Sequence, residues 1–381
     1  MHDDSRETAT GRAGEGRAMS SRRQMLRGAA GAAAGIVFAG CCWPTAPLAQ
    51  PAAARPVTVN GKRVKTIDVH AHCFFEEATA LLGEEARRLT PPTIRGSTAT
   101  YLALEERLKS MDEQAIDMEV LSINPFWYER ERDLAAKIVA IQNEKLAELV
   151  GAHGERFAAF ASLTLQDPLL AVEELETAVK KQGLRGAAIG GSVGAASFSD
   201  VKFHPIWAKA EELGAVLFIH PRGVPELAQR LKGNGWLANT IGNPLETTIA
   251  LEHLIFEGTL DRFPRLKILA AHGGGYLPAY AARSDHACYV GEGFCDKEIK
   301  LAKRPSEYLK QLHFDSLVFT AEELRHLVAE VGASQVVLGS DNPYPWQPHP
   351  VDHVLATASL NDEEKIAILG GNAARLLGLQ A

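Results

Sequence analysis

Two histidines, His70 and His72, lie two residues apart at the end of an apolar run. Residues two apart on a strand point to the same face, so the two imidazoles would share one site. His220, His272 and Asp341 end later apolar runs in the same way. Imidazoles and a carboxylate are donors that suit zinc, manganese or another divalent metal, so the five side chains are candidates for one metal site.

These candidates need a scaffold that brings the ends of separate apolar runs together. Eight short runs predict strands, and longer amphipathic stretches between them predict helices. The predicted strands are Thr66–His70, Met118–Ser122, Phe157–Leu163, Gly186–Gly190, Val216–His220, Ile268–His272, His313–Ser316 and Val336–Ser340. The predicted helices include Asp133–His153, Pro168–Gln182, Phe203–Glu212, Pro244–Glu257 and Thr320–Val331.

The alternation of strands and helices predicts an α/β fold with parallel strands and crossover helices. Eight such units predict a closed (β/α)8 TIM barrel, in which the C-terminal ends of all the strands face one mouth. An open doubly wound sheet would usually carry a glycine-rich phosphate loop after its first strand, and no G-x-G-x-x-G follows Thr66–His70. We therefore predict one barrel over residues 55–381, with a functional insertion after the first strand at about 73–107.

Residues 1–54 differ in composition from the rest of the chain. Arg22 and Arg23 precede an uncharged apolar run from Gly28 to Gly40 and then an Ala- and Pro-rich segment. This order is typical of an export signal, and the paired arginines predict the twin-arginine machinery and a periplasmic location. Two alternatives remain, a lipid anchor at Cys41 and a disordered tail with a chance pair of arginines.

The overall composition excludes several classes of protein. Of 381 residues, 46% are hydrophobic and 23% charged, which excludes a disordered chain and a collagen-like fibre. The formal net charge of −7 and the lack of a basic, aromatic-rich patch give no support to nucleic-acid binding. Beyond the leader, the cysteines are Cys73, Cys288 and Cys295, of which the last two could bridge in an oxidising compartment.

Several motifs together resemble the amidohydrolase-2 family of metal-dependent TIM-barrel enzymes, and most nearly its aminocarboxymuconate-semialdehyde decarboxylase-like members. The motifs that carry the resemblance are Asp68–His72, His220-Pro221, His272–Gly275 and Gly339–Asp341. The likeness extends to Val120–Pro125, Gly242–Thr248, Leu260–Pro264 and Gly371–Ala373, and it covers residues 64–378. The metal motifs are specific to the superfamily rather than to one substrate.

The resemblance implies a role for each candidate. His70, His72, His220 and Asp341 would bind zinc, with manganese or another divalent metal as alternatives. His272 would be the acid/base beside the metal-bound water, and Asp341 would also take part in catalysis.

The resemblance also implies that arginines bind the substrate. Arg95 and Arg283 match the family's carboxylate-binding arginines, and two such residues would suit a dicarboxylate substrate because arginine pairs bidentately with carboxylates. Arg283 would reach into the neighbouring subunit's site, which implies a homodimer. Arg222 stands where the family has an aromatic residue, and it adds a third cation near the mouth.

Three functions are consistent with this pattern. The first is a non-oxidative, zinc-dependent decarboxylase of an unsaturated or aromatic carboxylic acid, which uses the metal-bound water and His272. The second is a metal-dependent hydrolase that sends hydroxide onto a lactone, ester or amide in the same site. The third is a periplasmic binding protein without turnover, which would not need an acid/base at His272.

Overall fold

The strands of the barrel occupy the positions that the apolar runs predict. The computed structural model describes residues 55–86 and 103–380. After a hairpin of β1 (Thr58–Val59) and β2 (Lys62–Arg63), eight strands follow. They are β3 (Ile67–His72), β4 (Met118–Ser122), β5 (Phe157–Ala159), β6 (Gly186–Ile189), β7 (Val216–Ile219), β8 (Lys267–Ala270), β9 (His313–Asp315) and β10 (Val336–Val337).

All neighbouring pairs among these eight strands are parallel, and they form two runs, β3-β4-β5 and β6-β7-β8-β9-β10. A bridge between Ala161 and Ala187 joins the segment after β5 to β6. A second bridge, between Ala71 and Asn342, joins β3 to the segment after β10. The strands therefore close into the predicted barrel. β5 and β10 end earlier than predicted because the chain beyond them pairs only through such single contacts.

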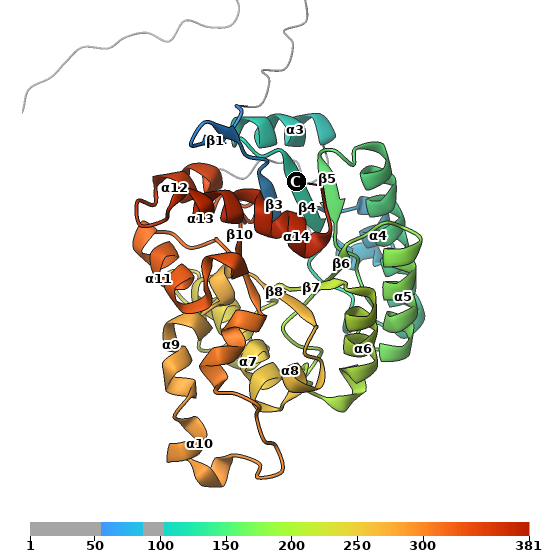
Figure 1. Cartoon of the computed structure of the whole chain (residues 1–381). Coiled ribbons are helices and arrows are strands. Elements are labelled where there is room, and N and C mark those ends of the chain that lie inside the picture. The colour runs from blue at the N-terminus through green and yellow to red at the C-terminus, as the bar shows by residue number, and fades with distance from the viewer. Residues whose placement is uncertain (1–54, 87–102, 381) are drawn as a thin grey trace, which may run out of the picture. The chain divides into compact units, whose positions relative to one another are not determined.

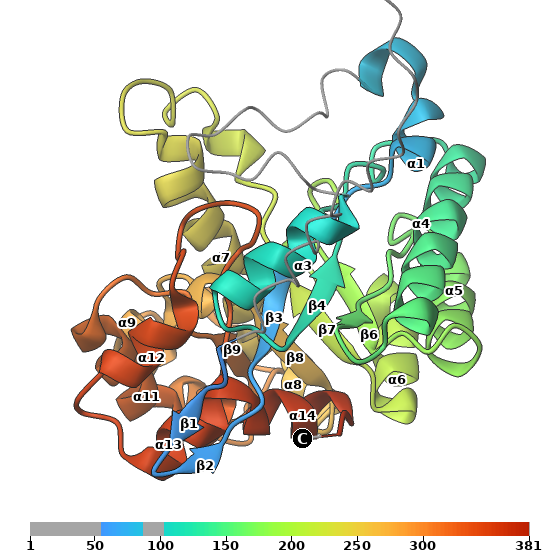
Figure 2. The ribbon, with the colours of Figure 1, turned by 90° about the horizontal axis from the view of Figure 1, so that it is seen from above.

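Helices surround the strands. Viewed from above, α4, α5 and α6 lie on one side of the barrel and α9, α11 and α12 on the other (Figure 2). The helices, labelled in Figure 1 where there is room, are α1 (Glu76–Ala80), α3 (Leu104–Glu113), α4 (Arg132–Ala152), α5 (Pro168–Lys180), α6 (His204–Leu213), α7 (Asn243–Phe256), α8 (Thr259–Arg262), α9 (Leu277–Ser284), α10 (Ala287–Val290), α11 (Ala321–Val331), α12 (Pro350–Ala356), α13 (Asp362–Ile366) and α14 (Asn372–Leu377).

The core has two parts, which share the strands between them. In β7, Val216 and Phe218 pack in one hydrophobic cluster, while Leu217 and Ile219 pack in the other, larger one. This division follows from the alternation of side chains along a strand. The smaller cluster also contains residues of α14 together with the first residues of several strands, so α14 covers the N-terminal end of the barrel. The opposite end is left for the functional site.

Several predictions fall on particular segments. The leader, with Arg22, Arg23 and Cys41, and the candidate Arg95 lie outside the described residues. Within the part that the structure describes, no helix is both long and apolar enough to cross a bilayer. Helix α3 begins inside the interval that the sequence predicts as an insertion.

The two cysteines Cys288 and Cys295 form a disulfide at α10, in the segment that follows α9. Cys73 is free and buried. This pairing is the one that the sequence left open for an oxidising compartment.

Candidate metal centre

The two histidines of β3 share one face, as predicted. His70 Nε2 lies 3.1 Å from His72 Nε2. Asp341 Oδ1 lies 3.1 Å from the first of these nitrogens and 2.8 Å from the second. All three side chains are buried. The C-terminal end of β3 therefore contributes two nitrogen donors beside one carboxylate oxygen.

His220 and Asp341 reach the same point from other strand ends. His220 continues the row of Val216 and Phe218, which faces away from the surrounding helices, and its Nε2 lies 4.0 Å from Asp341 Oδ1. Asp341 follows β10 in a left-handed conformation with φ 68°. Gly339, two residues earlier, permits this approach, because a Cβ there would lie 2.7 Å from the Cβ of Asp315 and 3.1 Å from the Cβ of His70.

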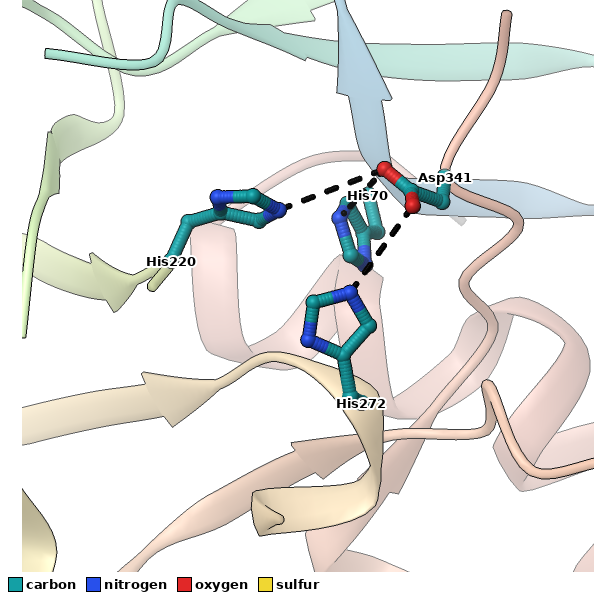
Figure 3. Close-up of side chains that lie close together, drawn as sticks. All are labelled: His70, His220, His272 and Asp341. Atoms are coloured by element: carbon teal, nitrogen blue, oxygen red, sulfur yellow. Dashed lines mark ion pairs between the residues drawn. The ribbon is translucent and has the colours of Figure 1, made fainter. Parts of the chain in front are cut away.

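His272 approaches from a turn rather than from a strand. β8 ends at Ala270, two residues earlier than predicted, and His272 has φ 56°, so the alternation of β8 does not set its direction. Its Nε2 lies 3.8 Å from Oδ2 of Asp341, the other carboxylate oxygen (Figure 3). Its side chain is 18% exposed, whereas that of His70 is fully buried. Non-glycine residues with positive φ are uncommon and concentrate at functional sites, and here they include His272 and Asp341.

A further carboxylate, Asp315 at the end of β9, orients the centre. It accepts a hydrogen bond from His70 Nδ1 at 2.7 Å, and others from the backbone N–H of His272 at 2.9 Å and of Gly273 at 2.8 Å. Because Nδ1 of His70 faces Asp315, its Nε2 is the ring nitrogen that faces the centre, where a bound metal would take the place of a proton. Burial alone would raise the pKa of Asp315, but the hydrogen bond and positive charge of His70 lower it.

The donors fit a divalent cation. Ligand atoms on a tetrahedral zinc ion lie about 3.3 Å apart, close to the spacings among His70, His72 and Asp341. His220 adds two buried ring nitrogens without a hydrogen-bond partner among the described residues. The ligand atoms of His70, His220, His272 and Asp341 all lie within 4.8 Å of one another. An unpaired buried nitrogen beside a carboxylate is costly unless a cation occupies the space between them.

The charges of these groups agree with that role. Burial lowers the pKa of His72, and it lowers the pKa of His220 well below its usual value, so both imidazoles are neutral. Burial would raise the pKa of Asp341, but the charge of His70 and hydrogen bonds from neighbouring histidines hold it well below its ordinary value. Burial also opposes a proton on His70, yet Asp341 and Asp315 raise its pKa to about 10. The negative charge that favours a proton there also favours a metal ion.

A cavity of about 480 Å³ opens beside the centre. His220 and Asp341 line it, and so do two cations, Arg222 and Arg130. Its aromatic wall includes Phe126, Tyr344, and the stacked rings of Trp236 and Trp346, whose centroids lie 5.7 Å apart. A second, smaller cavity of about 140 Å³ is lined by His272, Leu317 and Phe319 among others.

The predicted arginines have different positions. Arg222 lines the large cavity, as the sequence predicts. Arg283 is exposed on α9 and does not line this cavity in its own chain. Sequence reasoning missed Arg130, Glu129 and Asp315. Asp315 is the residue before the last of the predicted strand His313–Ser316, which is a signal that could have identified it, whereas the two loop residues carry no such signal.

The comparison with known families agrees with this geometry. The pattern of the family described as amidohydrolase (Amidohydro_2) matches residues 67–379, which span the barrel. The chain belongs to the amidohydrolase family. The predicted family and TIM-barrel fold are therefore confirmed, and the chain is an enzyme of the amidohydrolase superfamily.

The relatives of this amidohydrolase are named decarboxylases. It is 32% identical to 2-amino-3-carboxymuconate-6-semialdehyde decarboxylase of Dictyostelium discoideum over 276 residues, which cover 72% of this chain and 76% of that protein. It is 31% identical to gamma-resorcylate decarboxylase of Rhodococcus jostii over 290 residues, with coverage of 72% and 87%.

A solved structure extends this comparison to a metal. Dihydroxybenzoic acid decarboxylase from Polaromonas sp. JS666, with bound manganese and the inhibitor 2-nitroresorcinol, matches with a TM-score of 0.72 and 26% identity. The match covers 84% of this chain and 98% of that chain. These relatives are thus named decarboxylases, the Polaromonas structure holds manganese, and a divalent metal is supported here.

Proposed function

We propose that this amidohydrolase is a non-oxidative decarboxylase of an aromatic or unsaturated carboxylic acid. The observation that carries the proposal is the arrangement around Asp341. Three imidazoles lie toward its Oδ1, while His272 lies toward Oδ2 and is more exposed. This division provides one group of donors for a metal and one separate histidine for proton transfer, beside a cavity that carries cationic side chains.

The proposed metal ligands are His70, His72, His220 and Asp341. They would hold zinc, or manganese as in the Polaromonas structure. When bound, the cation supplies positive charge that holds and polarises the oxygen atoms of the acid. Asp315 keeps the lone pair of His70 Nε2 directed at the centre.

His272 is the proposed acid/base. A proton passes from its ring nitrogen to the carbon that bears the carboxylate, and the carbon–carbon bond then breaks. The electron pair of that bond returns to the unsaturated system, and CO₂ leaves, so no oxidant or reductant is required. Asp341 Oδ2 lies 3.8 Å from His272 Nε2, so the proposed acid/base stands beside the proposed ligands, and positioned general acids contribute about 10²- to 10⁴-fold to a rate.

The arginines are proposed to hold the acid. Arg222 lines the cavity from its own chain. Arg95 and Arg283 are proposed to bind carboxylate groups, Arg283 in the neighbouring subunit of a homodimer. Support for the dimer comes from the exposure of Arg283 and from nearby exposed apolar side chains, Tyr289 and Phe294 among them.

Mixing two inactive variants tests the contribution of Arg283 to the partner. If Arg283 acts across the interface, a heterodimer of the Arg283→Ala and His272→Gln subunits contains one site with both residues intact and one site with neither. Random pairing makes half of the dimers heterodimers, so activity of up to about a quarter of the wild-type value is expected. If mass measurement finds heterodimers and the mixture is still inactive, Arg283 does not act in the partner's site.

We also propose that residues 1–54 direct export through the twin-arginine machinery to the periplasm. The disulfide between Cys288 and Cys295 supports this location, because disulfides persist in oxidising compartments. Replacing Arg22 and Arg23 with lysine is expected to leave the protein in the cytoplasm, as measured by cell fractionation. Unchanged export, or a lipid on Cys41, contradicts the soluble twin-arginine route.

Assays on metal-loaded protein test the reaction. We expect CO₂ release from a panel of aromatic and unsaturated acids that includes 2,6-dihydroxybenzoate, and no acid release from lactones, esters or amides. His272→Gln is expected to keep its metal and to lose turnover, whereas the double variant His70→Ala/His220→Ala is expected to lose the metal. Hydrolysis without CO₂ release contradicts the proposed reaction, and near-stoichiometric metal in the double variant contradicts the ligand assignment.

A further inference from the structure

One arginine in the large cavity is already paired with a carboxylate of the protein. The guanidinium of Arg222 donates two hydrogen bonds to Glu129, at 2.9 Å from Nη1 and 3.0 Å from Nη2. The two residues both line the cavity that also contains His220 and Asp341. A bidentate pair of this kind has the geometry with which an arginine binds the carboxylate of a ligand.

The structure holds Arg222 firmly. Its backbone N–H and that of Gly223 donate to the buried carboxylate of Glu246 on α7, the latter at 2.6 Å. The guanidinium lies over the ring of Tyr128, 5.1 Å from the ring centroid. Tyr128 is itself buried, and its hydroxyl accepts a hydrogen bond from the backbone of Gly190. The side chain of Arg222 is 25% exposed, so the cation is fixed in place at the wall of the cavity.

Glu129 is held much less firmly. It lies in the loop between β4 and α4, and its side chain is 59% exposed. Ion pairs at a protein surface contribute about 0.2–1 kcal/mol, and the bidentate geometry of this pair together with the 25% exposure of Arg222 places it at the upper end of that range. Glu129 can therefore turn into solvent at little cost, while Arg222 stays where it is.

We propose that Arg222 binds a second acidic group of the substrate, and that Glu129 occupies this place until the substrate displaces it. The substrate is then an aromatic or unsaturated acid with two acidic groups. One is the carboxylate that leaves at the metal centre, and the other is retained and held by Arg222. The inference rests on the proposed function only in placing the reacting carboxylate at the metal centre.

Three probes that need no turnover test the proposal by calorimetry on the full-length, metal-loaded protein. Isophthalate carries two carboxylates, 3-carbamoylbenzoate has the same shape with a neutral second group, and benzoate has no second group. Glu129→Gln is expected to tighten isophthalate binding about fivefold, the factor that corresponds to an ion pair of about 1 kcal/mol. The affinities of the other two probes are expected to change by less than twofold.

A second variant and a matched control complete the design. Arg222→Gln is expected to reduce the affinity for isophthalate to that for 3-carbamoylbenzoate. Glu85→Gln removes the same charge from a neighbouring pair, because Glu85 lies 2.7 Å from Arg130, another arginine of the cavity. Glu85 does not line the cavity, so its substitution is expected to leave all three affinities unchanged.

Several outcomes would overturn the proposal. It fails if wild-type protein does not bind isophthalate, if Glu129→Gln leaves isophthalate affinity unchanged, or if it tightens all three probes alike. Equal tightening by Glu85→Gln, which leaves Arg130 without its carboxylate, would contradict a specific role of Arg222. If the three probes bind as expected but no acid releases CO₂, the proposed function is refuted and this inference stands. If an acid releases CO₂ but the probes do not bind as expected, this inference is refuted and the proposed function stands.

Discussion

Replacing Asp315 with asparagine is expected to weaken metal binding although Asp315 is not a proposed ligand. In the structure it accepts hydrogen bonds from His70 Nδ1 and from the backbone N–H groups of His272, Gly273 and Leu317. Asparagine keeps the shape, but it has one acceptor oxygen instead of two. Its NH₂ group would face at least one of these donors. A proton displaced from Nδ1 of His70 would move to Nε2, the nitrogen that faces the centre.

The expected magnitude follows from the bond that is lost. A hydrogen bond to a charged group contributes about 1.5–3 kcal/mol, and the bond from His70 to Asp315 is short and fully buried. Since about 1.4 kcal/mol corresponds to a factor of ten, the dissociation constant of the metal is expected to rise about 10- to 100-fold. The variant is expected to fold, because the barrel strands and their hydrophobic core are unchanged.

Competition with a metal-binding dye measures this dissociation constant directly. Asp261→Asn provides the control, since Asp261 also accepts hydrogen bonds from a tyrosine hydroxyl, that of Tyr308, and from the backbone, but it lies outside the cavity. The control is expected to lose stability without a change in metal affinity. A dissociation constant within twofold of wild type for Asp315→Asn, or an equal change in both variants, would refute the reasoning.

Three further predictions concern pH, packing and the metal. Burial raises the pKa of Glu174 to about 7 against the hydrogen bonds from Thr164, so its contribution to stability is present at low pH and is lost as pH rises through 7. Urea unfolding is to be measured at pH 5, 6.5 and 8. The free energy of unfolding of the wild type is expected to fall by up to about 1.4 kcal/mol per pH unit relative to that of Glu174→Gln, and the same pH dependence of both proteins would contradict this. Trp207→Ala is expected to cost about 3–5 kcal/mol in chemical unfolding, because the side chain is 1% exposed and donates to the carbonyl of Phe198. Removal of the metal by a chelator is expected to lower the midpoint of thermal unfolding. Metal added at 100 times its dissociation constant is expected to restore about 2.7 kcal/mol of the free energy of unfolding. A midpoint that does not change with metal would argue against a site formed only in the folded chain.

Most of the fold could be predicted because its signals are local. Each strand of the barrel is a short apolar run between turn residues, and the matching helices begin within one or two residues of their predicted starts. The predicted ends were less accurate where a strand leads into the site. β8 stops before His272 because the chain turns there with positive φ, which a hydrophobic pattern does not reveal.

By itself, the sequence determined the order of strands and helices, and it identified the five side chains that converge at the mouth. These follow from residue type, spacing of apolar residues and position at the end of a strand. Only the tertiary structure decided which atoms meet. Asp315 contacts His70 across a separation of 245 residues, and Glu129 contacts Arg222 across 93. Contacts of this kind depend on closure of the barrel and on the path of its loops, because neither partner carries a local signal of the other.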